Sequence, residues 1–351
     1  MGRIDCDIHP AVPSVQALLP YLSDHWREQV VIRGIDGMEL NSYPPTMPLS
    51  CRADWRVADR KPGSDLSRMQ ADALDKFGIS TAICNVIYGS QAILDPYMEV
   101  AFCSATNQWL AREWLQRDTR LRASIVVPMQ NPSLAVEEIE KWASDPRFVQ
   151  VLLLSTGEAP LGRRHFWPIY AAAEKHGLTV GIHAGSQYRQ APSSAGFPSY
   201  RYEFYQAEAQ AFQSQVVSLV FEGVFKEYPR LKVVLMESGV SWLPAFMWRA
   251  TKTWRGLRNE APWIDRSPAD IIRDHIRLTV QPFDGPPDAT GLTNLLDQIG
   301  SEDMLLFASD YPHWQFDGED PMPPGFPSEL VRRMCVDNPL NTYPRLKETI
   351  R

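Results

Sequence analysis

Residues 3–10 read Arg3-Ile4-Asp5-Cys6-Asp7-Ile8-His9-Pro10, a run typical of a β-strand that ends at a proline. Side chains alternate between the two faces of a strand, so Asp5, Asp7 and His9 lie on the same face. Asp5 comes early in the strand and is expected to point into the interior. Asp7 and His9 stand at the carboxyl end, where a carboxylate and an imidazole can both bind a divalent cation. This pair predicts a metal site if further ligands follow other strands.

Beyond this strand, short apolar runs alternate with amphipathic segments. Seven more strands are expected, at 79–87, 121–127, 148–154, 178–183, 231–236, 276–280 and 304–309. Continuous apolar strands separated by helices indicate a parallel sheet covered on both faces. Eight such units in 351 residues predict a (β/α)8 TIM barrel rather than an open doubly wound sheet. The glycine-rich nucleotide-binding motifs that would favour the open sheet do not follow any of these strands.

Two long stretches interrupt this alternation. Residues 33–65 and 184–203 are rich in Gly, Pro, Ser and aromatic residues. Loops of this length are uncommon in a compact domain unless they serve a function. We therefore expect a single domain over 1–351, with the two loops lying over a site at the C-terminal mouth of the barrel.

Composition narrows the classes of partner. The chain has 35 Lys and Arg against 42 Asp and Glu, a net charge of −7 and no basic tract, so nucleic acid is not expected as a partner. No apolar run follows Met1, which predicts neither a signal peptide nor a membrane span. The five cysteines form no C-x-x-C pair, which is typical of free thiols in a reducing cytoplasm. A small-molecule substrate and a cytoplasmic location follow as expectations.

Catalytic groups of a TIM barrel lie at the C-terminal ends of its strands. Besides Asp7 and His9, the fifth, sixth and eighth predicted strands end in His183, Glu237 and Asp310. Each of these alone is more often a satisfied buried polar group, and Asp310 alone could be a helix cap. Together, Asp7, His9, His183 and Asp310 form a nitrogen and oxygen ligand set that suits Zn²⁺, Mn²⁺ or Fe²⁺.

These motifs resemble the amidohydrolase superfamily. They are most similar to its amidohydrolase-2 branch, which contains aminocarboxymuconate semialdehyde decarboxylase and the resorcylate and carboxyvanillate decarboxylases. Asp7-Ile8-His9 matches the branch's first-strand H-x-H or E-x-H pair, with Asp7 in place of the usual His or Glu. His183 matches its strand-five histidine and Asp310 its strand-eight aspartate. The resemblance spans nearly the whole chain and implies one divalent metal ion, Zn²⁺ or Mn²⁺. It leaves a homodimer or larger homo-oligomer open.

The resemblance departs from the family pattern at strand six. Many members place there a histidine that acts on metal-bound water, whereas this chain has Glu237. A buried carboxylate with a raised pKa can serve as a general base. Glu237 could equally be a structural acceptor for the backbone amides that follow it.

The main functional prediction is a metal-dependent hydrolase. Water activated at the ion would cleave an amide, ester or lactone in a small organic substrate. Asp310 would take up the proton and return it to the leaving group, with Glu237 or His313 assisting. His313 could instead simply stack on its neighbour.

The alternative prediction is a metal-dependent, non-oxidative decarboxylase of an aromatic or muconate-type acid. In this reading Asp310 protonates the carbon that loses CO₂. A cation for the substrate acid would come from Arg52, Arg56 or Arg249, although each of these is also expected at the surface. A third interpretation is a metal-stabilised barrel that binds a ligand without catalysis.

Overall fold

The computed structural model describes residues 2–38, 51–186, 190–313 and 318–349. Eight parallel strands follow one another around a single sheet in chain order. They are β1 (Arg3–Ile8), β2 (Ile79–Cys84), β3 (Leu121–Val126), β4 (Phe148–Thr156), β5 (Thr179–Ser186), β6 (Val233–Met236), β7 (Ile276–Thr279) and β8 (Leu305–Leu306). The backbone N–H groups of Cys6 and His9 donate to the carbonyls of Phe307 and Tyr311 at 2.9 and 2.7 Å, so the chain after β8 meets β1. The predicted TIM barrel is confirmed.

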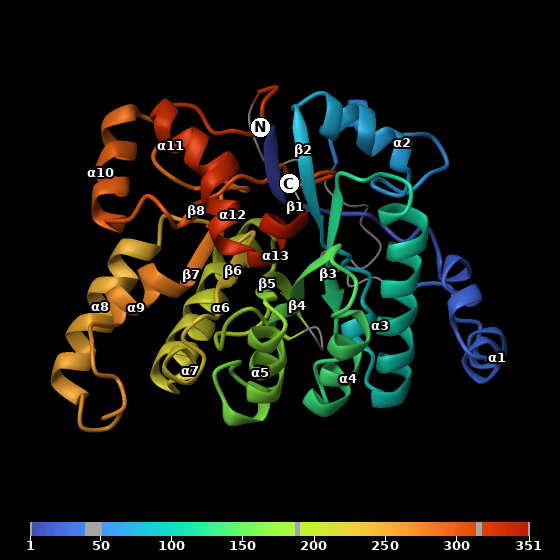
Figure 1. Cartoon of the computed structure of the whole chain (residues 1–351), viewed down its shortest axis with the longest axis horizontal. Coiled ribbons are helices and arrows are strands. Elements are labelled where there is room, and N and C mark those ends of the chain that lie inside the picture. The colour runs from blue at the N-terminus through green and yellow to red at the C-terminus, as the bar shows by residue number, and fades with distance from the viewer. Residues whose placement is uncertain (1, 39–50, 187–189, 314–317, 350–351) are drawn as a thin grey trace.

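Helices surround the strands on the outside (Figure 1). The α-helices are α1 (Asp24–Arg33), α2 (Leu66–Met69), α3 (Pro96–Leu110), α4 (Pro132–Trp142), α5 (Trp167–Lys175), α6 (Arg201–Phe221), α7 (Val224–Glu227), α8 (Leu243–Leu257), α9 (Pro268–His275), α10 (Ala289–Ile299), α11 (Ser328–Arg332), α12 (Asn338–Thr342) and α13 (Pro344–Thr349). Every residue of β3 and all but the last of β4 are buried, as expected for parallel strands covered on both faces. Within the described ranges, no helix is both long and apolar enough to cross a bilayer.

Two strand boundaries differ from expectation for a structural reason. β2 was expected over 79–87 but ends at Cys84, where its pairing with Ile8 of β1 is the last one and the Asn85 N–H donates to Ile8 at 2.9 Å. β8 was expected over 304–309 but covers only Leu305–Leu306. Beyond it, the backbone reaches β1 through single hydrogen bonds rather than a regular ladder. Both irregular ends carry residues of the site described below.

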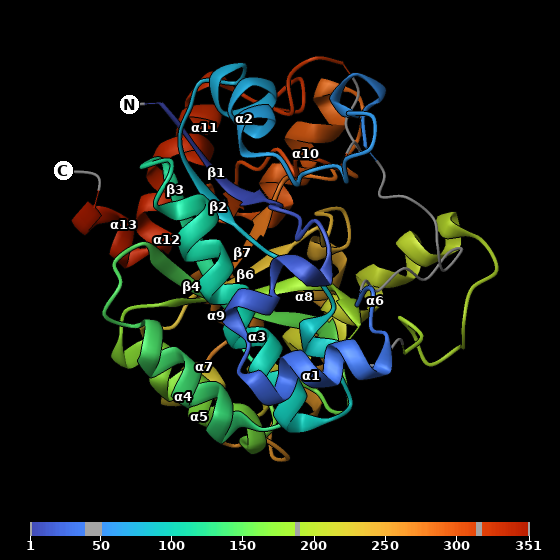
Figure 2. The same cartoon turned by 90° about the vertical axis from the view of Figure 1, so that its right-hand side faces the viewer.

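The C-terminal helices close one end of the barrel. Thr179 Oγ1, at the start of β5, donates to the carbonyl of Thr342 at 2.7 Å. Asn338 Nδ2 donates to the carbonyls of Leu305 and Glu302 at 2.9 and 2.7 Å. In Figure 2 both chain termini therefore lie on one side of the barrel, and the carboxyl ends of the strands open on the other. We call these two sides the bottom and the mouth.

The two loops predicted to cover the mouth lie partly outside the described residues. In the described part of the first loop, Cys51, Arg52 and Trp55 are buried. The ring of Trp55 lies 4.8 Å from that of Tyr311, so this segment packs beside the end of β8. The covering role of both loops remains a prediction.

Candidate metal centre

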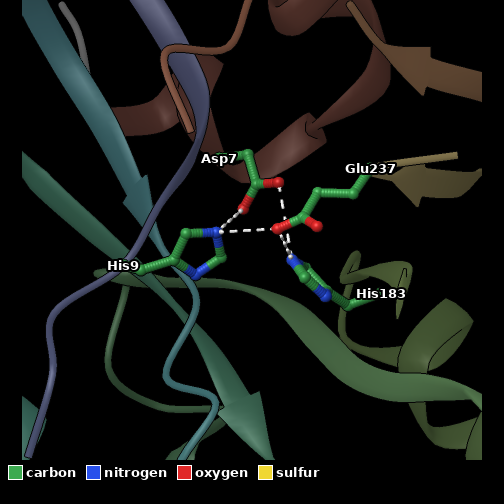
Figure 3. Close-up of side chains that lie close together, drawn as sticks. All are labelled: Asp7, His9, His183 and Glu237. Carbon is green, nitrogen blue, oxygen red and sulfur yellow. Dashed lines mark ion pairs between the residues drawn. The ribbon is translucent and has the colours of Figure 1, made fainter. Parts of the chain in front are cut away.

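Four side chains from three strand ends point toward one another at the mouth (Figure 3). Asp7 lies in β1 and His183 in β5, whereas His9 and Glu237 are the residues directly after β1 and β6. His183 Nε2 lies 3.2 Å from Glu237 Oε1 and 3.7 Å from Asp7 Oδ2. His9 Nε2 lies 3.3 Å from Asp7 Oδ1 and 3.7 Å from Glu237 Oε1. One ligand atom from each of the four lies within 4.8 Å of the others.

A second group shares two of these residues. His9 and Glu237 also lie beside Asp310 and His313, which follow β8. His9 Nε2 is 3.1 Å from Asp310 Oδ1, and His313 Nδ1 is 2.8 Å from the same oxygen. His313 Nδ1 is also 3.3 Å from Glu237 Oε1. The structure thus brings together all four predicted ligands and both predicted helpers, Glu237 and His313.

The unpaired atoms of this cluster show what would fit there. Among the residues that the structure describes, five buried atoms of this cluster have no hydrogen-bond partner: Asp7 Oδ2, His9 Nε2, His183 Nε2, Glu237 Oε1 and Asp310 Oδ2. The two Nε2 atoms lie 3.1–3.7 Å from carboxylate oxygens of the cluster, but these contacts are not oriented as hydrogen bonds. Each unsatisfied buried polar group costs about 1–3 kcal/mol, so five in one place indicate a missing common partner. Imidazole nitrogens and carboxylate oxygens together suit a divalent cation such as Mn²⁺ or Zn²⁺.

Neighbouring groups aim the ligand atoms inward. His9 Nδ1 donates to the backbone carbonyl of Asn85 at 2.9 Å, and His183 Nδ1 to that of Ala184 at 2.7 Å. These bonds leave the Nε2 lone pair of each neutral ring facing the cluster, which is the usual arrangement of histidine ligands. Asn85 Nδ2 also donates to Asp7 Oδ1 at 2.8 Å, so Asp7 offers its other oxygen.

Asn85 belongs to a polar layer that spans the barrel beneath the cluster. Its Oδ1 accepts hydrogen bonds from Ser124 Oγ at 2.6 Å and from Gln150 Nε2 at 3.2 Å. Gln150 Nε2 also reaches Ser124 Oγ at 2.8 Å. We call Asn85, Ser124 and Gln150 the floor network. The only hint of it in the sequence is a single amide or hydroxyl residue at each of these apolar strands, which is easily overlooked.

Two members of the cluster adopt a left-handed backbone. Glu237 has φ 58° and Asp310 has φ 57°, a region that non-glycine residues rarely occupy. Such residues cost on the order of 1–3 kcal/mol each and gather at functional sites. Both backbones are held in place, since Glu237 N–H donates to Thr279 Oγ1 at 3.2 Å and Asp310 N–H to the carbonyl of Asp7 at 3.0 Å.

The charges of the cluster shift one another's pKa values. Burial lowers the pKa of His183, but Glu237 and Asp7 outweigh it and raise that pKa to about 9. Burial raises the pKa of Glu237, but His183 and His313 bring it well below its usual range. The pKa of Asp7 is raised by burial, which His9 and His183 only partly offset. Protons and cations are thus attracted to the same place and compete for it.

The three predicted substrate arginines lie in different surroundings. Arg52 is buried and bonded to Asp54 through two nitrogens at 3.0 Å, and to Glu319 at 3.2 Å. Arg56 is exposed and has no carboxylate partner among the described residues. Arg56 and His313 both lower the pKa of the Cys51 thiol, which burial raises, so Arg56 lies near the cluster. Arg249 is exposed on α8, also without a described carboxylate partner.

One buried acid near the cluster does not follow from the strand pattern. Glu208 lies on α6, and the charges of Glu237 and His183 act on its carboxyl. An acidic residue on the inward face of an amphipathic helix is the only signal that could have drawn attention to it in the sequence.

Comparisons with known proteins find relatives of this chain in both sequence and structure. The family model Amidohydro_2, described as amidohydrolase, matches residues 4–345. A γ-resorcylate decarboxylase from Rhizobium sp. (strain MTP-10005) is 26% identical over 263 residues, covering 72% of this chain and 79% of that protein. The structure of amidohydrolase map2389c from Mycobacterium avium subsp. paratuberculosis K-10 superposes with a TM-score of 0.73 at 20% identity, covering 97% of each chain. A dihydroxybenzoic acid decarboxylase from Polaromonas sp. JS666, with bound manganese and 2-nitroresorcinol, has a TM-score of 0.65 at 20% identity and covers 97% of this chain and 96% of that one.

Proposed function

The chain belongs to the amidohydrolase family of the Amidohydro_2 type, and from this membership we propose that it is a metal-dependent, non-oxidative decarboxylase of an aromatic hydroxycarboxylic acid. The resemblance to the resorcylate decarboxylase-like branch is confirmed by the family match and by the curated relatives. Hydrolysis was the main prediction, but the relatives are decarboxylases and favour the alternative instead. The observation that carries the proposal is the set of five unpaired ligand atoms at the mouth.

In this proposal Asp7, His9, His183 and Glu237 hold the cation, and Asp310 borders it. When bound, the ion would supply a positive charge that fixes an anionic substrate and stabilises developing negative charge. Glu237 is assigned as a ligand rather than a general base for two reasons. Its Oε1 lies among the ligand nitrogens, and the imidazoles lower its pKa whereas a base at this position needs a raised one.

The proton that decarboxylation requires is assigned to Asp310 and His313. His313 Nδ1 lies 2.8 Å from Asp310 Oδ1, close enough to pass a proton to it. Asp310 would protonate the ring carbon that carries the carboxylate. The bond between that carbon and the carboxylate then breaks, its electron pair returns to the ring, and CO₂ leaves. Atoms and charge balance without an oxidant or reductant.

Arg56 is the arginine best suited to the substrate acid. Arg52 already has two carboxylate partners, and freeing it would break both ion pairs. Arg56 has none among the described residues and lies near His313 through Cys51. A planar guanidinium can hold a carboxylate through two parallel hydrogen bonds.

Product analysis tests the proposal directly. Protein supplied with Mn²⁺ should release CO₂ from hydroxybenzoates that carry a hydroxyl beside the carboxylate, and should not turn over a panel of aryl esters and lactones. Turnover of the esters or lactones without CO₂ release would refute decarboxylation and show that the protein is a hydrolase. A protein that binds Mn²⁺ and turns over neither panel would contradict both enzymatic assignments. The cytoplasmic location and a homo-oligomeric state remain predictions.

A further inference from the structure

The first half of α6 holds a buried acid that the proposed reaction has not used. Glu208 is only 4% exposed, on the face of α6 that also buries Phe212, Gln215 and Leu219. Ser155 Oγ, near the end of β4, lies 3.3 Å from Glu208 Oε2. The other carboxyl oxygen has no hydrogen-bond partner among the described residues.

Two other buried glutamates show how unusual this is. Glu99 accepts a hydrogen bond on each oxygen, from Met129 N–H at 2.7 Å and from Gln130 Nε2 at 2.9 Å. Glu138 accepts two hydrogen bonds, from Asn107 Nδ2 at 2.9 Å and Trp142 Nε1 at 2.6 Å. A buried carboxyl without such partners is destabilising unless something else binds it. Glu208 therefore accepts fewer hydrogen bonds from the described residues than either of these structural acids.

The surroundings of Glu208 favour its neutral form. Burial raises its pKa to about 7, and the negative charge of Glu237 contributes, while His183 opposes the shift. Ser155 also opposes the shift, because its hydroxyl donates to Glu208 Oε2 at 3.3 Å and so favours the charged form. Burial nevertheless keeps the pKa of Glu208 raised. A neutral carboxyl in an apolar wall can donate to a substrate oxygen without carrying a charge of its own.

The helix places Glu208 at the level of the site. Its contact Ser155 is the next-to-last residue of β4, and the charge of His183 on β5 acts on it. Residues earlier in α6 extend beyond the strand ends, on the side of the barrel opposite the chain termini (Figure 2). Tyr205 and Arg201 precede Glu208 by three and seven residues and so share its face. Arg201 Nη2 donates to Tyr205 Oη at 2.9 Å, and Arg201 has no carboxylate partner among the described residues.

We propose that Glu208 contacts the substrate, hydrogen-bonding a second ring hydroxyl while the carboxylate end of the substrate lies at the metal centre, and that Tyr205 and Arg201 continue this wall outward. This inference rests on the proposed function and sharpens it, since it names the residue that selects for a second ring hydroxyl. Glu208 is then a residue that determines specificity, separate from the groups that hold the ion.

Substrate pairs test the inference. The ratio of kcat/KM for 2,6-dihydroxybenzoate to that for 2-hydroxybenzoate would be measured in the wild type and in Glu208→Leu and Glu208→Gln. A lost hydrogen bond to a buried partner should lower this ratio about tenfold in the leucine variant. The amide of the glutamine variant still donates and should keep most of the ratio. Gln210→Leu, an exposed position on the same helix, is the matched control and should leave the ratio unchanged.

A merely structural Glu208 would lower kcat/KM equally for both substrates, and an unchanged ratio in Glu208→Leu would overturn the inference. A binding measurement separates this outcome from failure of the proposed function. Titration calorimetry of the Mn²⁺-loaded protein would compare 2-nitroresorcinol with 2-nitrophenol, which lacks one ring hydroxyl. A preference for 2-nitroresorcinol that depends on Glu208, without CO₂ release from any acid, would refute decarboxylation and support the contact. CO₂ release, together with a preference for 2-nitroresorcinol that does not depend on Glu208, would support decarboxylation and refute the Glu208 contact.

Discussion

The bottom and the mouth of this barrel treat their buried polar groups differently. At the bottom the donors of Thr179 and Asn338 reach backbone carbonyls, and neutral atoms such as Asn338 Oδ1 and Thr342 Oγ1 have no partner among the described residues. At the mouth the unpaired atoms belong to three carboxylates and two imidazoles in one cluster, and two of these residues have a left-handed backbone. The mouth thus combines clustered ionisable groups with backbone strain, and a bound ligand can compensate for both. The bottom holds the fold together, whereas the mouth is completed by what it binds.

The largest effect should come from removing a ligand at the mouth. Changing an outer partner of a metal ligand already costs about 10–100-fold in affinity, so His183→Ala should cost more than about 100-fold in Mn²⁺ affinity. Metal analysis after dialysis would measure occupancy, and circular dichroism would check the fold. Unchanged occupancy in a folded variant would refute the assignment of His183 as a ligand.

Removing the ion itself should destabilise the mouth and spare the bottom. An ion present at about 1,000 times its dissociation constant stabilises the native state by roughly 4 kcal/mol. Chelation with EDTA should therefore lower the melting temperature by several degrees, measured by calorimetry on protein of known metal content. Hydrogen exchange should increase first around β1 and β5 at the mouth. A melting temperature that is unchanged by EDTA would show that the cluster of charged side chains is stable without a cation.

Glu208, near the mouth, should make the free energy of unfolding depend on pH. Its folded pKa of about 7 lies above the ordinary 4.5, so its favourable neutral form is fully present below about pH 4.5 and is lost as the pH rises through about 7. Glutamine does not titrate. Relative to wild type, Glu208→Gln should thus gain stability between pH 5 and pH 8, by on the order of 2 kcal/mol.

Urea unfolding at the two pH values would measure this gain. Glu99→Gln is the control, because Glu99 also has a pKa raised by burial to about 7 but uses both oxygens as acceptors. It should lose stability at both pH values. A Glu208→Gln difference that does not vary with pH would show that Glu208 is already ionised at pH 5.

The smallest effect is expected at the bottom. Thr179→Val removes the hydrogen bond to Thr342 and keeps the shape of the side chain, so it should cost about 1 kcal/mol of unfolding free energy. Mn²⁺ affinity and activity should not change. Loss of metal affinity in this variant would show that the two ends of the barrel are energetically coupled. The bottom would then contribute to metal binding as well as to stability.

The sequence predicted this site as far as strand position determines it. Asp7, His9, His183 and Asp310 were found because each ends an apolar run, and the barrel brings such ends together. The proposed place of Glu237 among the ligands depends on a backbone φ of 58°, which a strand-end pattern does not encode. Glu208 was not predicted because it lies on a helix, where acidic residues are common. Only the structure shows which of them lie on the buried face.

Helix boundaries were predicted less well for a related reason. The sequence from Pro96 to Arg117 predicts one long amphipathic helix, whereas α3 covers Pro96–Leu110 and a π-helical turn follows at Ala111–Leu115. α9 was not predicted at all, because its eight residues give too short a periodic pattern to stand out. In both cases packing against neighbouring elements determines where the helix lies, and the local sequence does not predict that packing.

The floor network has a consequence for anyone who wishes to change what this protein accepts. In the described part of the chain, Ser124 and Gln150 make no hydrogen bond to the proposed ligands, yet both hydrogen-bond the Asn85 side chain, which donates to Asp7. Mutational libraries that include β3 and β4 will therefore recover inactive clones whose lesions lie away from the substrate, and these would be misread as specificity determinants. The wall on α6 is a different kind of target, since its residues lie on a separate element from the ligands. A library confined to positions 201, 205 and 208 varies the proposed recognition surface while leaving the proposed metal ligands unchanged.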